Sequence, residues 1–153
     1  MRIKGHVKTG ICLGGCVGLL MNHYNYDHNI IMVTALASAV GAVAPDFMEM
    51  GIIKHRTWTH WPVGWILLLV GSYFGALNHT EGVMYYYGLG GFCIGALLHV
   101  LADSPYYKGT PLIHPRRRLP TLQLEFEPRL NKLVEAIYML AMVSLTLWII
   151  FGQ

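Results

Sequence analysis

The sequence carries little charge for its length. Only 12% of its 153 residues are Asp, Glu, Lys or Arg, whereas 54% are hydrophobic. An average soluble domain has roughly 25% charged residues, which it needs to cover its surface. The composition therefore argues against a soluble fold and favours a membrane protein. The length is that of one domain and leaves no room for a second.

Cysteine is also scarce. Cys12, Cys16 and Cys93 all lie in apolar stretches, and none has the C-x-x-C or C-x-x-H spacing. The absence of this spacing excludes a cysteine-based zinc motif. We therefore expect three small buried side chains rather than ligands or disulfide bridges.

Five apolar stretches are present, at residues 9–21, 29–44, 62–77, 82–102 and 133–151. The last two have about the 20 residues that a spanning helix needs, and the first three approach that length with uncharged flanking residues. The basic start, MRIKGHVKTG, resembles a signal peptide, but no A-x-A-like cleavage site follows it. We therefore predict an all-α integral membrane protein, a single membrane domain over 1–153 built as a bundle of about five transmembrane helices.

The basic residues decide the predicted topology. With five spans, the N-terminus, residues 45–61 and residues 103–132 share one side of the bilayer. That side holds all eleven basic residues: Arg2, Lys4, Lys8, Lys54, Arg56, Lys108, Arg116, Arg117, Arg118, Arg129 and Lys132. Because positively charged loops stay in the cytoplasm, we expect a bacterial inner-membrane protein with a cytoplasmic N-terminus, a cytoplasmic loop at 103–132 and a periplasmic C-terminus.

The same side collects most of the side chains that bind metal ions. They are His6 before the first span, Asp46 and Glu49 after the second, His55 and His60 before the third, His99 and Asp103 at the end of the fourth, and His114 in the long loop. Polar groups are costly in a bilayer and usually face the bundle interior or a wet cavity. We therefore expect separate segments to bring these side chains together at one membrane depth.

The spacing of individual pairs leaves alternatives open. His99 and Asp103 are four residues apart, so a helix places them on one face, either as two ligands of one ion or as a histidine capped by a carboxylate. His55 and His60 are five apart, about 140° around a helix. That pair converges only if the chain turns between them; otherwise both are solvated loop histidines.

A mixture of imidazole and carboxylate suits a divalent ion, zinc foremost, with manganese or magnesium favoured by more oxygen ligands. The predicted ligands are His6, Asp46, His60, His99 and Asp103, followed by His55 and Glu49. Glu49 is also the predicted general base, and Arg56 is predicted to stabilise developing charge. The run Arg116–Arg118 is either an anchor on anionic lipid or a clamp for a phosphate-bearing head group.

The order of these motifs resembles the YdjM-type family of bacterial inner-membrane proteins, described as membrane-bound metal-dependent hydrolases. The matching motifs are Gly5-His6, Pro45-Asp46, H-R-x-x-T-H at 55–60, H-x-x-x-D at 99–103 and G-x-P-L-x-x-P at 109–115. The resemblance covers roughly His6 to Pro115. Members are distantly similar to zinc-dependent phospholipases C, which implies a phosphoester substrate.

One motif departs from the family pattern. Members tend to read P-D-x-D-H after the second helix, whereas Met48 and Glu49 stand at the last two positions here. Methionine binds a hard ion poorly, so the site either holds fewer ions or has lost catalysis. The expected function is a metal-dependent hydrolase acting at the cytoplasmic face on a phosphoester of a lipid or lipid-like substrate. The alternative is a non-catalytic membrane component or partner-binding protein with a structural or degenerate metal site. No nucleic-acid partner is expected.

Overall fold

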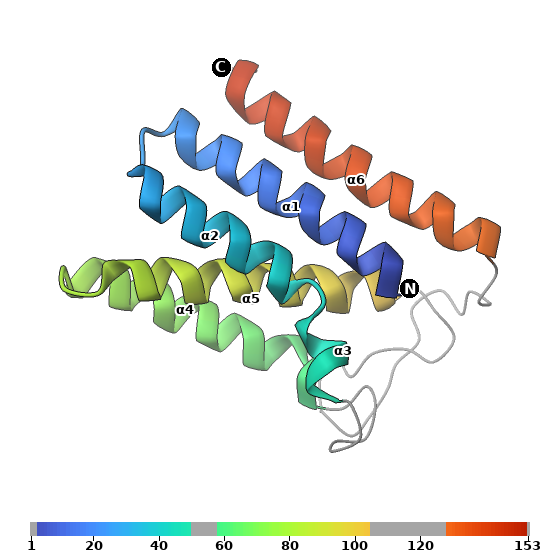
Figure 1. Ribbon diagram of the computed structural model, residues 1–153, viewed down its shortest axis with the longest axis horizontal. Coiled ribbons are helices and arrows are strands. Elements are labelled where there is room, and N and C mark those ends of the chain that lie inside the picture. Colours follow the sequence, from blue (N-terminus) through green and yellow to red (C-terminus); the bar gives the residue numbers. More distant parts are fainter. Residues whose placement is uncertain (1–2, 50–57, 105–127, 153) are drawn as a thin grey trace.

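A computed structural model of the chain describes residues 3–49, 58–104 and 128–152, which are helical apart from short turns (Figure 1). The elements are α1 Ile3–His23, α2 His28–Gly41, α3 Ala44–Met48, the 3-10 turn η1 Trp58–His60, α4 Pro62–Asn78, α5 Val83–Asp103 and α6 Pro128–Phe151. The predicted all-α class is confirmed. Most of the predicted loop 103–132 lies outside the described residues.

Each predicted apolar stretch lies on a helix, but three boundaries differ. Helix α1 begins at Ile3 and α6 at Pro128, several residues before the apolar stretches start. Basic and polar residues form helix as readily as apolar ones, so apolarity marks only part of each helix. The stretch 29–44 breaks after Gly41, and α3 then begins at Ala44 with a proline in its first turn, a position where proline is tolerated.

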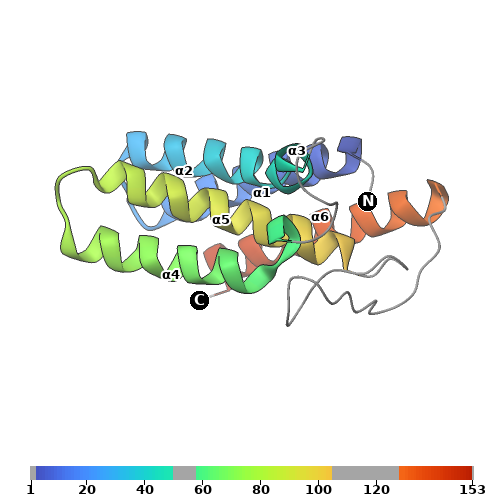
Figure 2. The same cartoon turned by 90° about the horizontal axis from the view of Figure 1, so that it is seen from below.

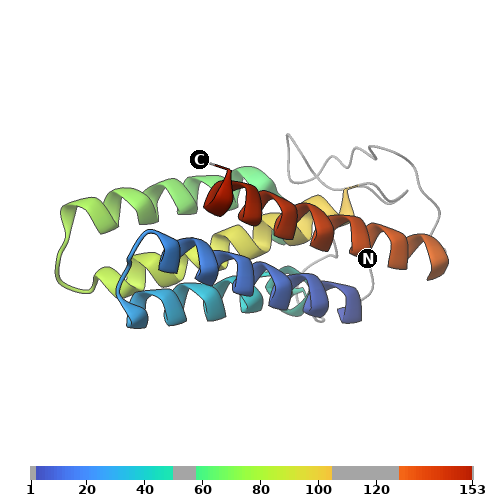
Figure 3. The ribbon, with the colours of Figure 1, turned by 90° about the horizontal axis from the view of Figure 1, so that it is seen from above.

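The five long helices alternate in direction (Figure 1). The connections 24–27 and 79–82 lie at one end of the bundle, here called the turn end. The N-terminus, α3 and the last turn of α5 lie at the other, here called the histidine end. Neighbours pack in the order α6, α1, α2, α5, α4. Figure 2 shows α5 between α2 and α4, and Figure 3 shows α6 along α1.

Glycines allow α2 to pack closely against both of its neighbours. A Cβ atom added to Gly14 of α1 would lie 2.6 Å from the carbonyl oxygen of Ala35. A Cβ added to Gly91 of α5 would lie 2.5 Å from the carbonyl oxygen of Thr34, and one at Gly95 would overlap that of Ser38. Small residues at such positions let helix backbones approach one another in a membrane.

Two helices, α5 and residues Lys132–Phe151 of α6, are long and apolar enough to cross a membrane. Helices α2 and α4 are apolar but have only 14 and 17 residues, below the roughly 20 that a span needs. Length and apolarity of the described helices therefore support two spans and do not confirm five. Large apolar side chains are nevertheless exposed along α4 and α6, among them Leu67, Leu140 and Trp148 at 64%, 68% and 69%.

Candidate metal centre

Five of the predicted ligands meet at the histidine end. His6 comes from the second turn of α1, Asp46 from α3, His60 from η1, and His99 and Asp103 from the last turns of α5. His6, His60, His99 and Asp103 are between 0% and 2% exposed, and the Asp46 side chain is 20% exposed. His6 precedes the predicted apolar stretch 9–21, and it is helical because α1 begins at Ile3. Together with Glu49, these residues are called the histidine–carboxylate cluster.

Local structure explains why these segments meet. The helical spacing of four residues places His99 and Asp103 on one face of α5, as predicted. The break after Gly41 turns the chain, so that α3 contacts both α5 and η1. On the other side, the indole Nε1 of Trp65 in α4 donates a hydrogen bond to the carbonyl oxygen of Thr59, at 2.7 Å, and holds η1 against α4.

Three ligand atoms form a nearly equilateral triangle. The Nε2 atoms of His60 and His99 are 3.1 Å apart. Asp46 Oδ1 lies 3.6 Å from His60 Nε2 and 3.5 Å from His99 Nε2. Two ligands of a tetrahedral zinc ion are about 3.3 Å apart, given bond lengths of about 2.0–2.1 Å. The triangle thus has the dimensions of one face of a zinc coordination shell.

The contacts of the Nδ1 atoms of His60 and His99 determine that their Nε2 atoms face the ligand triangle. His99 Nδ1 lies 2.8 Å from the carbonyl oxygen of Ala42, which can only accept a hydrogen bond, so Nδ1 carries the proton. His60 Nδ1 lies 3.0 Å from the carboxylate oxygen Oε1 of Glu49. In neutral imidazoles this leaves an unprotonated Nε2 on each ring, directed at the other. Two facing lone pairs repel each other unless a cation lies between them.

The cluster also contains buried polar atoms that lack hydrogen bonds. Among the described residues, no contact of either ring nitrogen of His6 or of Asp46 Oδ1 has the geometry of a hydrogen bond, although charged or polar atoms lie close to His6 Nε2 and to Asp46 Oδ1. His6 stacks on the His99 ring with 3.8 Å between centroids, and its Nε2 lies 3.2 Å from Asp103 Oδ1. Asp103 Oδ2 lies 3.9 Å from His60 Nε2. Since buried polar groups are normally hydrogen-bonded, these atoms fit metal ligands.

The charge of Asp46 suits a ligand. Helix α3 lies outside the long helices, and burial by itself would raise the pKa of Asp46. The neighbouring His60 and His99 imidazoles outweigh burial and hold that pKa below its ordinary value. The carboxylate is therefore ionised at neutral pH.

Glu49 lies against the outer side of the His60 ring. Its Oε1 contacts the Nδ1 of His60, on the far side of the ring from the Nε2 triangle, and accepts a hydrogen bond from the Thr59 hydroxyl. Its side chain is 2% exposed. A carboxylate on the outer nitrogen of a metal-binding histidine fixes the ring and raises its basicity. This contact suits an orienting partner of His60, and the predicted ligand and general-base roles of Glu49 stay predictions.

The described residues leave part of the predicted site out. His55, Arg56 and His114 lie outside them, as does the run Arg116–Arg118. Two contributors were missed from the sequence, the Ala42 carbonyl oxygen and the Thr59 hydroxyl. A backbone oxygen leaves no trace in the sequence. The threonine could have been suspected, because it directly precedes His60 in the H-R-x-x-T-H motif.

Comparison with known proteins gives one result. No curated protein and no solved structure matches the chain. A family model described as YdjM inner membrane protein matches residues 1–152, nearly the whole chain. The chain therefore belongs to the YdjM inner membrane protein family.

Proposed function

We propose that this inner-membrane protein binds a divalent metal ion, zinc foremost, in the histidine–carboxylate cluster and uses it to hydrolyse a phosphoester of a lipid or lipid-like substrate. The observation that carries the proposal is the triangle of His60 Nε2, His99 Nε2 and Asp46 Oδ1, with sides of 3.1–3.6 Å. Asp103 lies beside this triangle, with Oδ2 3.9 Å from His60 Nε2 and Oδ1 3.2 Å from His6 Nε2, so that Asp103 and His6 are further candidate ligands. In the catalytic case one position on the ion stays open for water.

The proposed chemistry is that of a Lewis-acid site. A divalent ion there would lower the pKa of a water molecule and polarise a phosphoryl oxygen. Glu49 and the Ala42 carbonyl oxygen orient the His60 and His99 rings, so that both present Nε2. Asp46, whose side chain is 20% exposed, is the most accessible member of the triangle and marks the side from which a substrate reaches the site.

The proposal also includes a multi-pass topology. Lys4 and Lys8 lie on the first two turns of α1, and Arg129 and Lys132 on the first two turns of α6, at the histidine end. The turn-end connections 24–27 and 79–82 contain no lysine or arginine. The positive-inside tendency then places the histidine end in the cytoplasm. We expect a reporter fused after Gln153 to read as periplasmic and one inserted at Arg117 as cytoplasmic; two reporters on one side would refute five spans.

Hydrolysis is tested on the purified protein in nanodiscs of phosphatidylethanolamine and phosphatidylglycerol, with zinc or manganese added. Release of water-soluble phosphate compounds is followed by ³¹P NMR. We expect metal-dependent release that is lost in Asp103→Asn at an unchanged melting temperature, because the amide keeps the volume of the side chain but not its charge. Glu81→Gln, at the exposed turn end, is the matched control. Release that persists in a variant without metal would contradict the proposal.

One observation favours a second function, a structural metal clasp. His6, His60, His99 and Asp103 are at most 2% exposed, and structural metal sites are closed whereas catalytic sites keep an open position. An ion there would join α1, α3, η1 and α5. In that case metal removal and Asp103→Asn would both lower the melting temperature, and the wild-type protein would release no phosphate compound with metal bound.

A further inference from the structure

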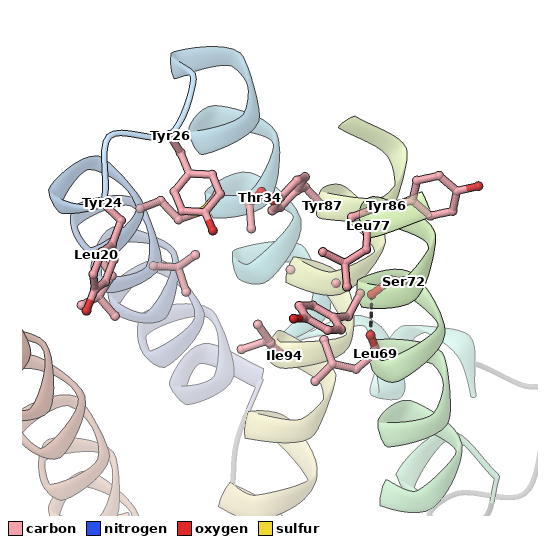
Figure 4. Close-up of a pocket in the computed structure, with 16 residues that line it drawn as sticks. Leu20, Tyr24, Tyr26, Thr34, Leu69, Ser72, Leu77, Tyr86, Tyr87 and Ile94 are labelled. Carbon is pink, nitrogen blue, oxygen red and sulfur yellow. Dashed lines mark hydrogen bonds between the residues drawn. The ribbon is translucent and has the colours of Figure 1, made fainter. Parts of the chain in front are cut away.

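A cavity of about 400 Å³ lies near the turn end, away from the histidine–carboxylate cluster (Figure 4). Helices α1, α2, α4 and α5 all contribute to its lining. Leu69 and Ile94 lie at its inner end, and Tyr26 and Tyr87 at the end near the turns. Ligand pockets in proteins have volumes of roughly 300–1,000 Å³, so the cavity is large enough to hold part of a ligand.

The interior of the cavity suits hydrocarbon. Apart from its tyrosines, its lining is largely apolar, and the hydroxyl groups of its one threonine and one serine donate to their own helices. Thr34 Oγ1 donates to the carbonyl oxygen of Ile30 and Ser72 Oγ to that of Leu69, both at 2.7 Å. Neither of these two protons is left for a polar ligand, so the hydroxyl groups left to meet a polar head group are those of the tyrosines. The wall also includes α5, one of the two helices long and apolar enough to cross a membrane.

The rim of the cavity is aromatic and polar. The rings of Tyr26 and Tyr87 meet edge to face with 5.6 Å between centroids, and Tyr24 is 55% exposed beside them. Tyrosines gather where a membrane meets water, because the ring is apolar and the hydroxyl polar. The nearby connections carry Asp27 and Glu81, both exposed, and no lysine or arginine. With histidine counted as neutral, the formal charge of these connections is negative, which favours an amine head group over an anionic one.

From these observations we infer that the cavity is a lipid site, which takes one acyl chain of an amine-bearing zwitterionic phospholipid with its head group at the tyrosine rim. The inference does not depend on the metal centre. A single phospholipid of this kind matches all three features: its acyl chain fits the apolar interior, and its head group fits the tyrosine rim and the nearby acidic side chains.

The test uses nanodiscs that contain a trace of phosphatidylethanolamine with a photoreactive group in its acyl chain. Labelled residues are mapped by peptide mass spectrometry. We expect labelling to concentrate on the lining residues Val17, Leu69 and Ile94 and to saturate with probe concentration. Unlabelled phosphatidylethanolamine should compete with it. A phosphatidylglycerol probe should label these residues less. Equal labelling by both probes, or uniform labelling of all lipid-facing residues without saturation, would overturn the inference.

Cavity-filling variants provide the second arm. Val17→Phe on α1 and Ala76→Phe on α4 replace lining residues with a larger side chain. We expect both to lose the saturable labelling. Ile11→Phe and Leu67→Phe, on the same helices but 65% and 64% exposed outside the cavity, should keep it. Retained labelling in stably folded filled variants would overturn the inference. Should those variants fail to fold, the competition experiment on the wild-type protein still decides.

Discussion

The two ends of the bundle contain the same kinds of side chain in opposite environments. Three histidines and two carboxylates lie at the turn end, namely His23, His28, His79, Asp27 and Glu81, and all are exposed. At the histidine end, three histidines are almost completely buried, and they face one another and three carboxylates. The presence of histidines and carboxylates therefore does not distinguish the two ends. Burial and convergence do, since among the described residues only those at the histidine end bring histidines and carboxylates from four elements to one centre.

The two ends also differ in whether their polar groups make hydrogen bonds within the protein. Near the turn end, Thr34, Ser72 and Asn78 each donate to a carbonyl oxygen of their own helix, and Asp27 accepts from the first turn of α2. At the histidine end, the ring nitrogens of His6 and Asp46 Oδ1 have no hydrogen-bond partner among the described residues. These turn-end groups are therefore satisfied within the protein, whereas the buried atoms at the histidine end are available to a ligand.

The largest predicted effect is on metal content. In the double variant His60→Ala, His99→Ala, two corners of the ligand triangle are lost, and we expect bound metal in the purified protein to fall to background by elemental analysis. The matched double variant His23→Ala, His79→Ala removes two exposed turn-end histidines and should retain the wild-type stoichiometry. Equal metal content in the two double variants would mean that the ion binds elsewhere.

The second-largest predicted effect is a loss of stability when the close contact between α2 and α5 is disturbed. In Gly95→Ala the added methyl group would overlap the Ser38 carbonyl oxygen, and overpacking of this kind typically costs about 1–3 kcal/mol. We expect a clearly lower melting temperature in detergent. Gly71→Ala, where an added Cβ has no neighbour within 4 Å, should melt like the wild type. A Gly95→Ala protein of unchanged stability would show that the two helices pack less closely than described.

A smaller effect is expected for Glu49→Gln. The glutamine still accepts a hydrogen bond from His60 Nδ1 but no longer supplies a negative charge. Partners of this kind typically change metal affinity by about 10–100-fold, which a competition titration with a chelator measures. Glu81→Gln at the turn end is the control. An unchanged affinity would deny the orienting role, and complete loss of metal would make Glu49 a direct ligand.

Part of this arrangement follows from the sequence. Apolar runs predict the long helices, and the one-sided distribution of lysine and arginine fixes a topology in which His6, His60 and His99 share one end. The relations that complete the site are not local. The break after Gly41 turns the chain and leaves the Ala42 carbonyl oxygen facing His99, 57 residues away. The contact of Glu49 with His60 Nδ1 instead of Nε2 depends on the placement of α3 beside η1, which no spacing rule specifies.

The central claim is that a divalent ion is held by imidazole and carboxylate ligands at the histidine end. X-ray absorption at the metal edge of the purified protein tests it most directly. The account predicts a first shell of nitrogen and oxygen at about 2.0–2.1 Å, with outer-shell scattering from at least two imidazoles and no sulfur. A protein that carries no ion after zinc or manganese loading, or a shell with sulfur at about 2.3 Å from cysteines such as Cys12 and Cys16, would contradict it.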